Sequence, residues 1–245
     1  MLNPLTILLE DAHLVAVDKP AGLAVIPGRA ETDSLLERLG RQLGLPVTGQ
    51  ADPRLRIVHR LDKDTTGVLL LAKDLDAQRH LSNQFQNNLI AKEYLALVVG
   101  RPPQDSGTID APLGPHPTAK ERMAVLKHGG RPAVTAWRIE QRFRQHTLLR
   151  CFPRTGKTHQ IRVHLAHIGL PLAIDPLYGP THPLMLSQLK KSYRPTGDQE
   201  RPLISRLTLH AHRLTFHHPD GRPLTVESPL PKDLRATINQ LGKLS

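Results

Sequence analysis

A polar turn that runs directly into an apolar stretch is the feature that most constrains this chain. The turn spans residues 59–67, with the sequence HRLDKDTTG, and residues 68–72, VLLLA, follow it without a polar break. Five apolar residues bounded by a turn signal are typical of a buried strand, and Gly67 supplies the backbone freedom that such a turn needs. A loop held by a buried strand keeps a side chain exposed yet fixed. Asp62 is therefore the first candidate for a reactive carboxylate.

The charge of the chain favours a nucleic-acid partner. Its 245 residues include 33 Lys and Arg but only 22 Asp and Glu, which gives a formal net charge of +11. A positive field of this size is expected of a protein that meets phosphates, although net charge also serves solubility. No apolar run approaches the length of about 20 residues that spans a bilayer, so we expect no membrane partner.

The start of the chain and its single cysteine indicate in which cellular compartment the protein works. The first residues lack a basic segment followed by a long apolar stretch, so we expect no secretory signal. Cys151 is the only cysteine, which excludes an internal disulfide and a cysteine-rich zinc site. A reducing, cytoplasmic setting is expected. Because aromatic residues make up only 3% of the chain, Tyr94, one of three tyrosines, stands out.

Hydrophobic periodicity predicts more strands than helices. Strands are expected at 14–17, 93–99, 207–209 and 214–216, with a hairpin formed by 135–143 and 146–152 around a tip at 144–145. Helices are expected at about 34–43 after Asp33 or Thr32, at about 75–88 after Asp74, and from Thr158 to Gly169. Strands that follow one another directly argue for an α+β fold, with a mixed, largely antiparallel sheet flanked by helices.

The length of the chain fits one domain spanning 1–245. Two stretches are predicted to be long loops: 100–132, which is rich in Pro, Gly and basic residues, and 180–202, which contains Lys190, Lys191, Arg194 and Arg201. Loops of this length are usually functional or disordered. Both direct RNA contact and a pair of solvated insertions remain open for them.

Residues 156–158, GKT, suggest a phosphate-binding loop before the expected helix. The full motif needs a glycine five positions before Gly156, but Cys151 stands there, and Pro153 removes an amide donor. Nucleotide hydrolysis is therefore not expected, and neither is a nucleotide cofactor. What remains is an anion-binding feature at the positive end of a helix, which suits an RNA phosphate.

Basic side chains gather at this expected helix. Arg154, Lys157 and His159 lie at its start, and Arg162 follows one turn further on, at the border of an apolar stripe. An arginine at the edge of a core usually has a carboxylate partner. A surface arginine that extends over the helix is the commoner arrangement.

A metal site is a further interpretation of the turn. His59, Asp62 and Asp64 could bind a hard divalent ion, but a metal nuclease should carry a third acidic ligand, and the sequence offers no clear one. Both aspartates could also be turn formers that cap local amides. We therefore predict no metal.

Six stretches of the chain stand in the order and spacing of a known family. They are KPAGL at 19–23, HRLD at 59–62 with TTG at 65–67, KEYLA at 92–96, TGKTHQIRVHL at 155–165, DPLYG at 175–179 and LHA at 209–211. Through them the chain resembles the RluA-type pseudouridine synthases (RluA/RluC/RluD-like) from about Ile7 to Pro229. The chain departs from the family pattern at two positions. Thr66 stands where serine is frequent and keeps the hydroxyl, and Lys157 stands where arginine is frequent and keeps the charge.

The resemblance implies a catalytic domain only, without room for an S4-type RNA-binding domain. It implies that Asp62 is the catalytic aspartate, that Tyr94 contacts the target uracil and that Arg162 pairs with the aspartate. Isomerising uridine breaks the bond from N1 to the ribose C1′, turns the base and reconnects it through C5, without a redox or energy cofactor. The carboxylate either attacks C1′ or takes a proton from the ribose, and the sequence leaves both open.

The reacting atoms are inaccessible in a stacked helix, so the target nucleotide must be flipped out. His59 and Arg60 are placed to fill the gap. With Arg154, Lys157, His159 and Gln160 they form the expected RNA-binding set. The expected partner is tRNA or rRNA, and a monomer is the working expectation.

Two alternatives accompany this reading. A non-catalytic RNA-binding or chaperone module would bind RNA without isomerising it, and the intact set of Asp62, Tyr94 and Arg162 argues against it. A metal-dependent nuclease that uses Asp62 and Asp64 would lose activity in chelator and would shorten its RNA.

Overall fold

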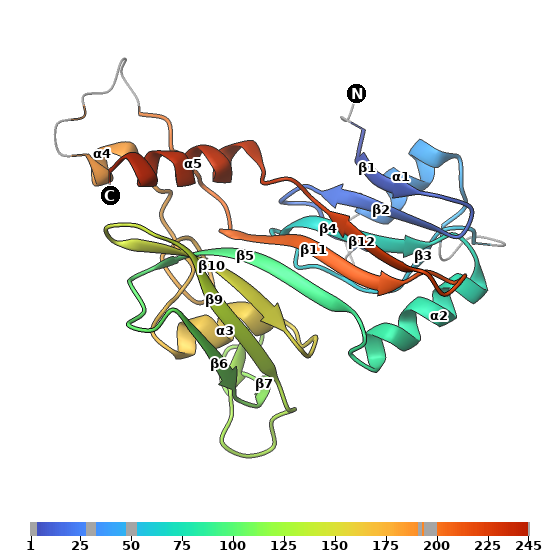
Figure 1. The fold of residues 1–245 in the computed structure, drawn as a ribbon, viewed down its shortest axis with the longest axis horizontal. Coiled ribbons are helices and arrows are strands. Elements are labelled where there is room, and N and C mark those ends of the chain that lie inside the picture. Colours follow the sequence, from blue (N-terminus) through green and yellow to red (C-terminus); the bar gives the residue numbers. More distant parts are fainter. Residues whose placement is uncertain (1–3, 28–32, 48–52, 191–192, 194–199, 245) are drawn as a thin grey trace. The chain divides into compact units, whose positions relative to one another are not determined.

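Two compact units make up the chain. The computed structural model describes residues 4–27, 33–47, 53–190, 193 and 200–244. One unit comprises Met1–Glu93 and Ala211–Pro229, and the other comprises Tyr94–His210 and Leu230–Ser245. Strands β5 (Ala91–Val99) and β11 (Leu209–His217) each begin in one unit and continue in the other. Figure 1 shows the elements coloured along the sequence.

The first unit is built on an antiparallel group of strands. β1 (Thr6–Glu10) and β4 (Thr66–Ala72) pair antiparallel with β2 (Leu14–Lys19), and β11 follows β4 in the strand order. β3 (Arg56–Ile57) pairs with β4, and β12 (Pro223–Glu227) pairs with β11. Every residue of β4 is buried, which confirms the strand predicted from the apolar run.

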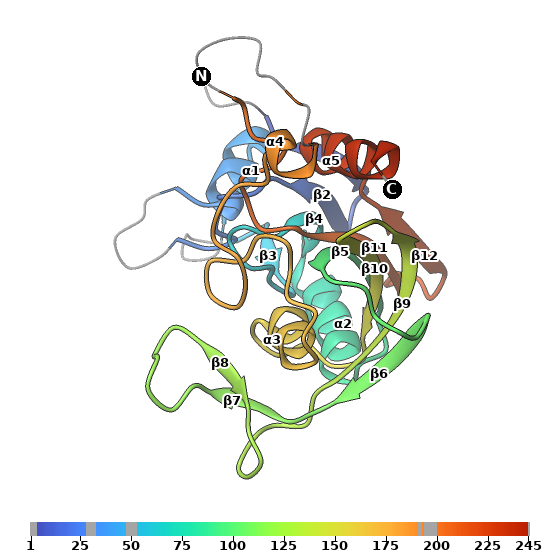
Figure 2. The same ribbon diagram turned by 90° about the vertical axis from the view of Figure 1, so that its left-hand side faces the viewer.

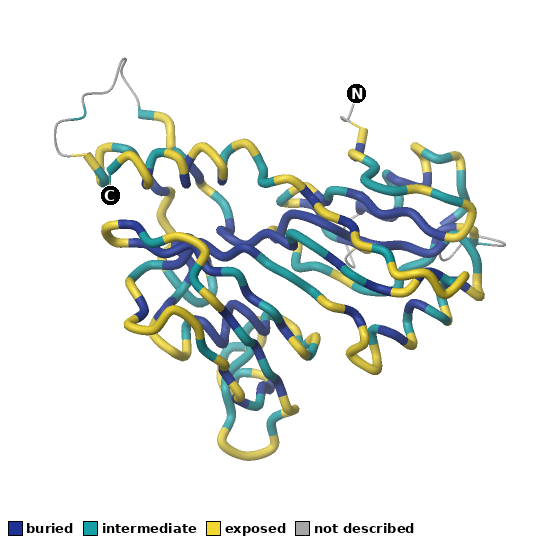
Figure 3. The backbone as a smooth tube through the Cα atoms, in the orientation of Figure 1, coloured by how far each residue is buried: buried dark blue, intermediate teal, exposed yellow. Residues whose placement is uncertain are grey.

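Two helices cover opposite faces of β4. Leu69 and Leu71 share a core with α1 (Leu35–Leu43), whereas Val68 and Leu70 share a core with α2 (Leu75–Gln86). Successive side chains of a strand point to opposite faces, so the strand is covered on both. Two-sided burial explains why the run is apolar throughout rather than alternating. Figure 3 shows the resulting buried band through this unit.

α1 (Leu35–Leu43) lies where the periodicity predicts it, but its cap differs. Ser34 is the N-cap, and its hydroxyl accepts a hydrogen bond from the Glu37 N–H at 3.2 Å. Asp33, one of the two expected caps, instead accepts hydrogen bonds from the Arg38 side chain. The other, Thr32, lies outside the described residues.

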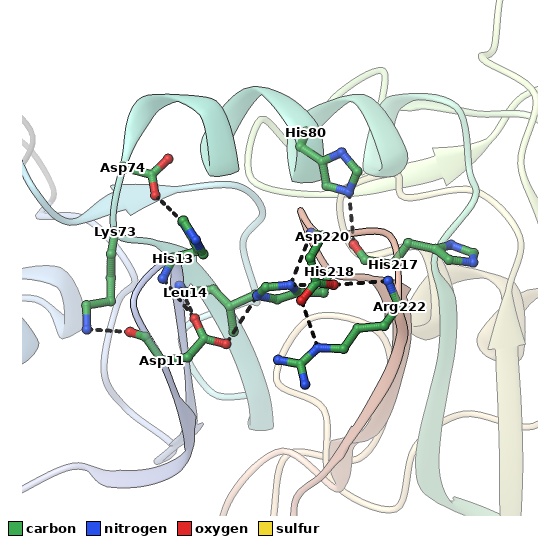
Figure 4. A network of polar contacts seen from close by, with 10 residues as sticks. All are labelled: Asp11, His13, Leu14, Lys73, Asp74, His80, His217, His218, Asp220 and Arg222. Atoms are coloured by element: carbon green, nitrogen blue, oxygen red, sulfur yellow. Dashed lines mark hydrogen bonds and ion pairs between the residues drawn. The ribbon is translucent and has the colours of Figure 1, made fainter.

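A polar network joins three segments of the first unit: the β1–β2 turn, the start of α2 and the β11–β12 turn (Figure 4). His218, only 3% exposed, lies between two carboxylates, with its Nε2 3.2 Å from Asp11 Oδ2 and its Nδ1 2.9 Å from Asp220 Oδ1. His13 Nδ1 lies 2.9 Å from Asp74 Oδ2, and Asp74 also caps α2 as predicted. These contacts hold together segments that are distant in sequence.

The second unit has its own antiparallel strands. β10 (His146–Pro153) pairs with β5 and with β9 (Val134–Arg142), and β6 (Ser106–Asp110) pairs with β9. The predicted hairpin of β9 and β10, with its tip at 144–145, is confirmed. With few helices among many strands, the expected α+β class is confirmed.

Two helices pack on the sheet of this second unit. α3 (Gln160–His167) contributes to a core with Leu149 and Cys151. α5 (Lys232–Lys243) contributes to a different core, with Leu97 and Leu148. Neighbouring residues of β10 therefore belong to different cores, and α3 and α5 cover opposite faces of it.

The stretch 100–132 is not a loop throughout, so that prediction was wrong. It contains β6 and a small hairpin of β7 (Leu113–Pro115) and β8 (Met123–Val125). β6 is held by its pairing with β9, which local composition does not show. Stretch 180–202 contains the short helix α4 (Leu186–Leu189), while its residues 191–192 and 194–199 lie outside the described residues.

Two further differences concern the ends of elements, and a third concerns a helix that was not predicted. Of the strand expected at 207–209 only Leu209 lies in a strand, and there it begins β11, which continues through the strand expected at 214–216. Thr158 does not cap α3, because the N-cap is His159, in the left-handed region at φ 54°. α5 was not predicted, although Leu234, Ile238 and Leu241 form an apolar stripe along it.

No described helix is long and apolar enough to cross a bilayer.

Candidate active site

The loop that carries Asp62 is fixed by backbone contacts at several points. The Thr65 N–H donates to the Asp62 carbonyl at 3.1 Å, which closes the turn. Lys19, fully buried at the end of β2, donates from Nζ to the Lys63 carbonyl at 2.6 Å and to the Pro20 carbonyl at 2.8 Å. A buried ammonium is costly unless hydrogen bonded, so this side chain ties the loop firmly to β2. Asp62 itself is partly exposed.

Gly67 ends this loop at the start of β4. Its φ of 114° is in the region that favours glycine, and a Cβ there would lie 2.1 Å from the Ala211 carbonyl oxygen of β11. Only glycine permits both the conformation and this close approach. The backbone freedom expected of Gly67 is thus used to seat the loop against the neighbouring strand.

His59 faces into the protein. Its Nε2 accepts a hydrogen bond from the Leu70 N–H at 3.0 Å, and its ring stacks on Phe85 with centroids 4.4 Å apart. Burial, and then the nearby charge of Lys92, lower the pKa of His59 to about 3, so the ring is neutral. These contacts hold the loop on β4, and the expected contact of His59 with RNA stays a prediction. Arg60 beside it is exposed.

Tyr94 and α3 lie on the same face of the strands of the second unit. Tyr94 stands opposite Cys151 in the β5–β10 pair, and it packs against the core that includes Ile161 and Leu165 of α3. Directly opposite residues in an antiparallel pair share a face of the sheet. The sheet thus brings the expected uracil contact to the helix that carries Arg162.

Arg162 is buried and has a carboxylate partner within its own unit, Asp175. Arg162 Nε donates to Asp175 Oδ2 at 2.8 Å, and Nη2 donates to Oδ1 at 2.7 Å. The two side chains are 7% and 1% exposed. Such a forked pair fixes the plane of the guanidinium. Sequence reasoning missed the role of Asp175, whose signal was its place in the DPLYG motif.

Tyr178, from the same motif, lies beside Arg162. Its ring centroid is 5.1 Å from the Arg162 guanidinium and 5.3 Å from that of Arg122. Its hydroxyl accepts a hydrogen bond from the Met123 N–H at 2.7 Å and lies 2.8 Å from His159 Nδ1. Burial raises the pKa of Tyr178, so the hydroxyl stays protonated. Sequence reasoning also missed this residue.

The other basic residues before α3 differ in their surroundings. Arg154 is exposed, and Lys157 and His159 are partly exposed. Gln160, also expected to bind RNA, is 4% exposed, and all four hydrogen-bonding positions of its amide are occupied within the protein. These bonds shape the loop before α3, and the expected contact of Gln160 with RNA stays a prediction. Among the described residues no group of three or more His, Cys, Asp or Glu could hold a metal ion.

Comparison with known proteins gives consistent findings. Residues 13–167 match the family described as RNA pseudouridylate synthase. The "Ribosomal large subunit pseudouridine synthase D" of Nitrosomonas europaea is 45% identical over 242 residues, which cover 98% of this chain and 66% of the relative. That of Xanthomonas campestris is 43% identical over 239 residues, which cover 97% and 70%. The chain thus spans about two thirds of the length of these curated relatives.

Solved structures show the same fold. "Human RNA Pseudouridylate Synthase Domain Containing 4" superposes with a TM-score of 0.73 at 28% identity, covering 97% of this chain and 93% of that one. "Human RNA Pseudouridylate Synthase Domain Containing 1" gives a TM-score of 0.72 at 23% identity, covering 93% and 84%.

Proposed function

Because this chain belongs to the RNA pseudouridylate synthase family, we propose that it isomerises uridine to pseudouridine in RNA, with Asp62 as the reacting carboxylate. The observation that carries the assignment of Asp62 is the way its loop is held. The fully buried Lys19 donates a hydrogen bond to the carbonyl of the residue after Asp62. The neutral His59, three residues before Asp62, accepts a hydrogen bond from β4. A carboxylate held this way is fixed in place while still partly exposed to a substrate.

The chemistry follows from the atoms that change partners. The bond from N1 to C1′ breaks, a bond from C5 to C1′ forms, and the C5 proton is lost while N1 gains one. The product has the same atoms as the substrate, and no redox or energy cofactor is needed. An ionised Asp62 either attacks C1′ or takes a ribose proton, and both roles need the charged form.

Tyr94 and Arg162 complete the proposed site. Tyr94 would offer a flat face to the turning uracil, and Arg162 would stabilise the charge of Asp62, as a nearby guanidinium favours an ionised carboxylate. Asp175 would keep the plane of that guanidinium fixed while it does so. The proposal requires Asp62, Tyr94 and Arg162 to meet around one uridine.

The proposed substrate is the RNA of the large ribosomal subunit. The two curated relatives above carry that substrate in their names, and the positive charge of the chain suits it. We propose a cytoplasmic protein that acts as a monomer, with exposed Arg60 entering the space left by the flipped nucleotide. Arg60→Ala should lower turnover of a folded RNA, and unchanged turnover would refute this role.

A matched pair of variants tests the central assignment. Asp62→Asn should bind RNA but form no pseudouridine, whereas Asp64→Asn, at an exposed position two residues on, should keep its turnover. Pseudouridine is mapped in large-subunit RNA from cells that lack the gene and are complemented with each variant. Turnover by Asp62→Asn above background would refute the assignment. RNA that is shortened by the wild-type protein but by neither variant would favour the metal-dependent nuclease instead.

A further inference from the structure

The β7–β8 hairpin of the second unit is a basic arm. Figure 2 shows it reaching away from the strands β6 and β9 of its own unit. Residues 113–131 contain four Lys or Arg and one Glu. Lys120, Lys127 and Arg131 are exposed. Clustered cations on an exposed hairpin suit the phosphates of RNA, whatever its sequence.

Tyr178 ties this hairpin to the rest of its unit. Met123 and Val125 of β8 pack with Tyr178 in a small apolar cluster that also contains Val163 of α3. The Met123 N–H donates to the Tyr178 hydroxyl at 2.7 Å. A backbone donor in this partly buried place needs an acceptor, and the tyrosine supplies it. The hydroxyl therefore sets where the second strand of the hairpin lies.

The same tyrosine also supports Arg162. Its ring centroid lies 5.1 Å from the Arg162 guanidinium, which is within the range of a cation–π contact. The Tyr178 N–H donates to Asp175 Oδ1 at 3.2 Å, and that oxygen also accepts from Arg162 Nη2. One carboxylate thus orders both the arginine and the backbone of the tyrosine.

We propose that the β7–β8 hairpin binds RNA phosphates and that Tyr178 is a positioning residue that couples this hairpin to Arg162 of the proposed site: its hydroxyl places the hairpin and its ring supports Arg162. The inference rests on the proposed function, in which Arg162 stabilises the charge of Asp62. It assigns two separable tasks to one side chain, so two substitutions at this position should have different kinetic effects.

Tyr178→Phe removes the hydroxyl and keeps the ring. We expect KM for RNA to rise by up to about 25-fold, since the loss of one buried hydrogen bond changes an equilibrium by about fivefold and the hydroxyl makes two contacts. The value of kcat should stay within about twofold of wild type. Tyr178→Leu removes the ring as well, and kcat should then fall by about tenfold, as expected for the loss of a desolvated cation–π contact.

A second aromatic residue of the same unit gives a matched control. Arg138 lies over the Phe152 ring at 5.7 Å, in a pair that takes no part in the proposed coupling. Phe152→Leu should therefore change neither KM nor kcat by more than about twofold, while showing how much stability such a substitution costs. Thermal unfolding of all three variants separates loss of folding from loss of coupling.

Amide hydrogen exchange at Met123 tests the hydroxyl link without relying on activity. In Tyr178→Phe this amide should exchange faster than in wild type, because its acceptor is gone. Unchanged exchange and unchanged KM in that variant would overturn the proposal, as would a fall in kcat equal to that of Tyr178→Leu. A wild-type protein that forms no pseudouridine would refute the proposed function instead, and the exchange result would still decide whether Tyr178 places the hairpin.

Discussion

The buried pair of Arg162 and Asp175 allows a quantitative prediction. Asp175→Asn removes the negative charge while leaving a side chain of nearly the same shape. Its carbonyl oxygen can still accept the Leu177 and Tyr178 N–H groups that Asp175 Oδ1 accepts at 2.9 and 3.2 Å. The amide nitrogen, however, would face a guanidinium donor of Arg162. The variant thus isolates the loss of the ion pair from the loss of the local turn.

The cost follows from the burial of the two side chains. With 7% and 1% exposure, neither charge is solvated well by water, so Arg162 would be left buried without the carboxylate of Asp175. Breaking a buried ion pair from one side costs about 3–5 kcal/mol, because the group that stays buried loses its charged, hydrogen-bonded partner. Since the turn is kept, we expect the lower end, about 3 kcal/mol, which is a change of more than about 100-fold in the unfolding equilibrium.

The assay uses urea unfolding followed by tryptophan fluorescence. Trp137 is the only tryptophan of the chain, is 7% exposed and belongs to the same unit as the pair. Asp105→Asn is the matched control, because Asp105 Oδ1 lies 2.8 Å from Arg142 Nη2 in that unit but the aspartate side chain is 90% exposed. The control should lose less than about 0.5 kcal/mol. A loss below about 1 kcal/mol in Asp175→Asn, or equal losses in both variants, would refute the reasoning.

Three further predictions concern single sites. Because burial lowers the pKa of His59 from 6.5 to about 3, its contribution to stability is present above pH 6.5 and is lost as the pH falls towards 3, with a slope approaching about 1.4 kcal/mol per pH unit. His59→Gln should flatten this acid dependence in urea midpoints, and an unchanged dependence would contradict the assignment. Burial raises the pKa of the Cys151 thiol to about 12, so a thiol reagent at pH 8 should label it only on unfolding, and rapid labelling of folded protein would contradict this. Gly67→Ala should lower the free energy of unfolding by more than about 3 kcal/mol in the same urea assay, because the new Cβ would lie 2.1 Å from the Ala211 carbonyl oxygen. Gly22→Ala is the control, since a Cβ at Gly22 would meet open space. Similar losses in the two variants would disprove the clash.

Much of the fold could be predicted because its signals are local. The apolar runs of β2 and β4, the N-cap Asp74 and the β9–β10 hairpin each depend on residues close in sequence. β6, β7 and β8 could not be predicted in this way. They are short, their segment is rich in Pro and Gly, and β6 is a strand because β9 offers its edge. Pairing of that kind depends on tertiary structure, which overrides local composition.

In the proposed site, too, some residues could be predicted from local sequence and others depend on tertiary structure. Asp62 could be proposed from its turn, and a carboxylate partner for Arg162 from the arginine's position beside an apolar stripe. Lys19 could not be found by such reasoning, since the carbonyl that it binds belongs to a residue 44 positions later in the chain. Gln160 is in the expected RNA-binding set, and its sequence position does not show that its amide is bonded within the loop before α3. Sequence spacing indicates which residues are near a site, whereas burial decides which of them face it.

The buried polar groups near the proposed catalytic residues argue for a common purpose. Burying an ammonium or an ion pair costs free energy that well-packed apolar side chains would not cost. Lys19 is a buried ammonium of this kind beside the Asp62 loop, and Arg162 on α3 forms a buried ion pair with Asp175. In each case the compensating bonds fix a geometry: a backbone carbonyl in the loop, and the plane of a guanidinium. Apolar replacements could match the stability but not the geometry. We therefore expect Lys19→Met to lower kcat far more than it lowers the urea midpoint, and a parallel loss of both would show that the lysine serves folding alone.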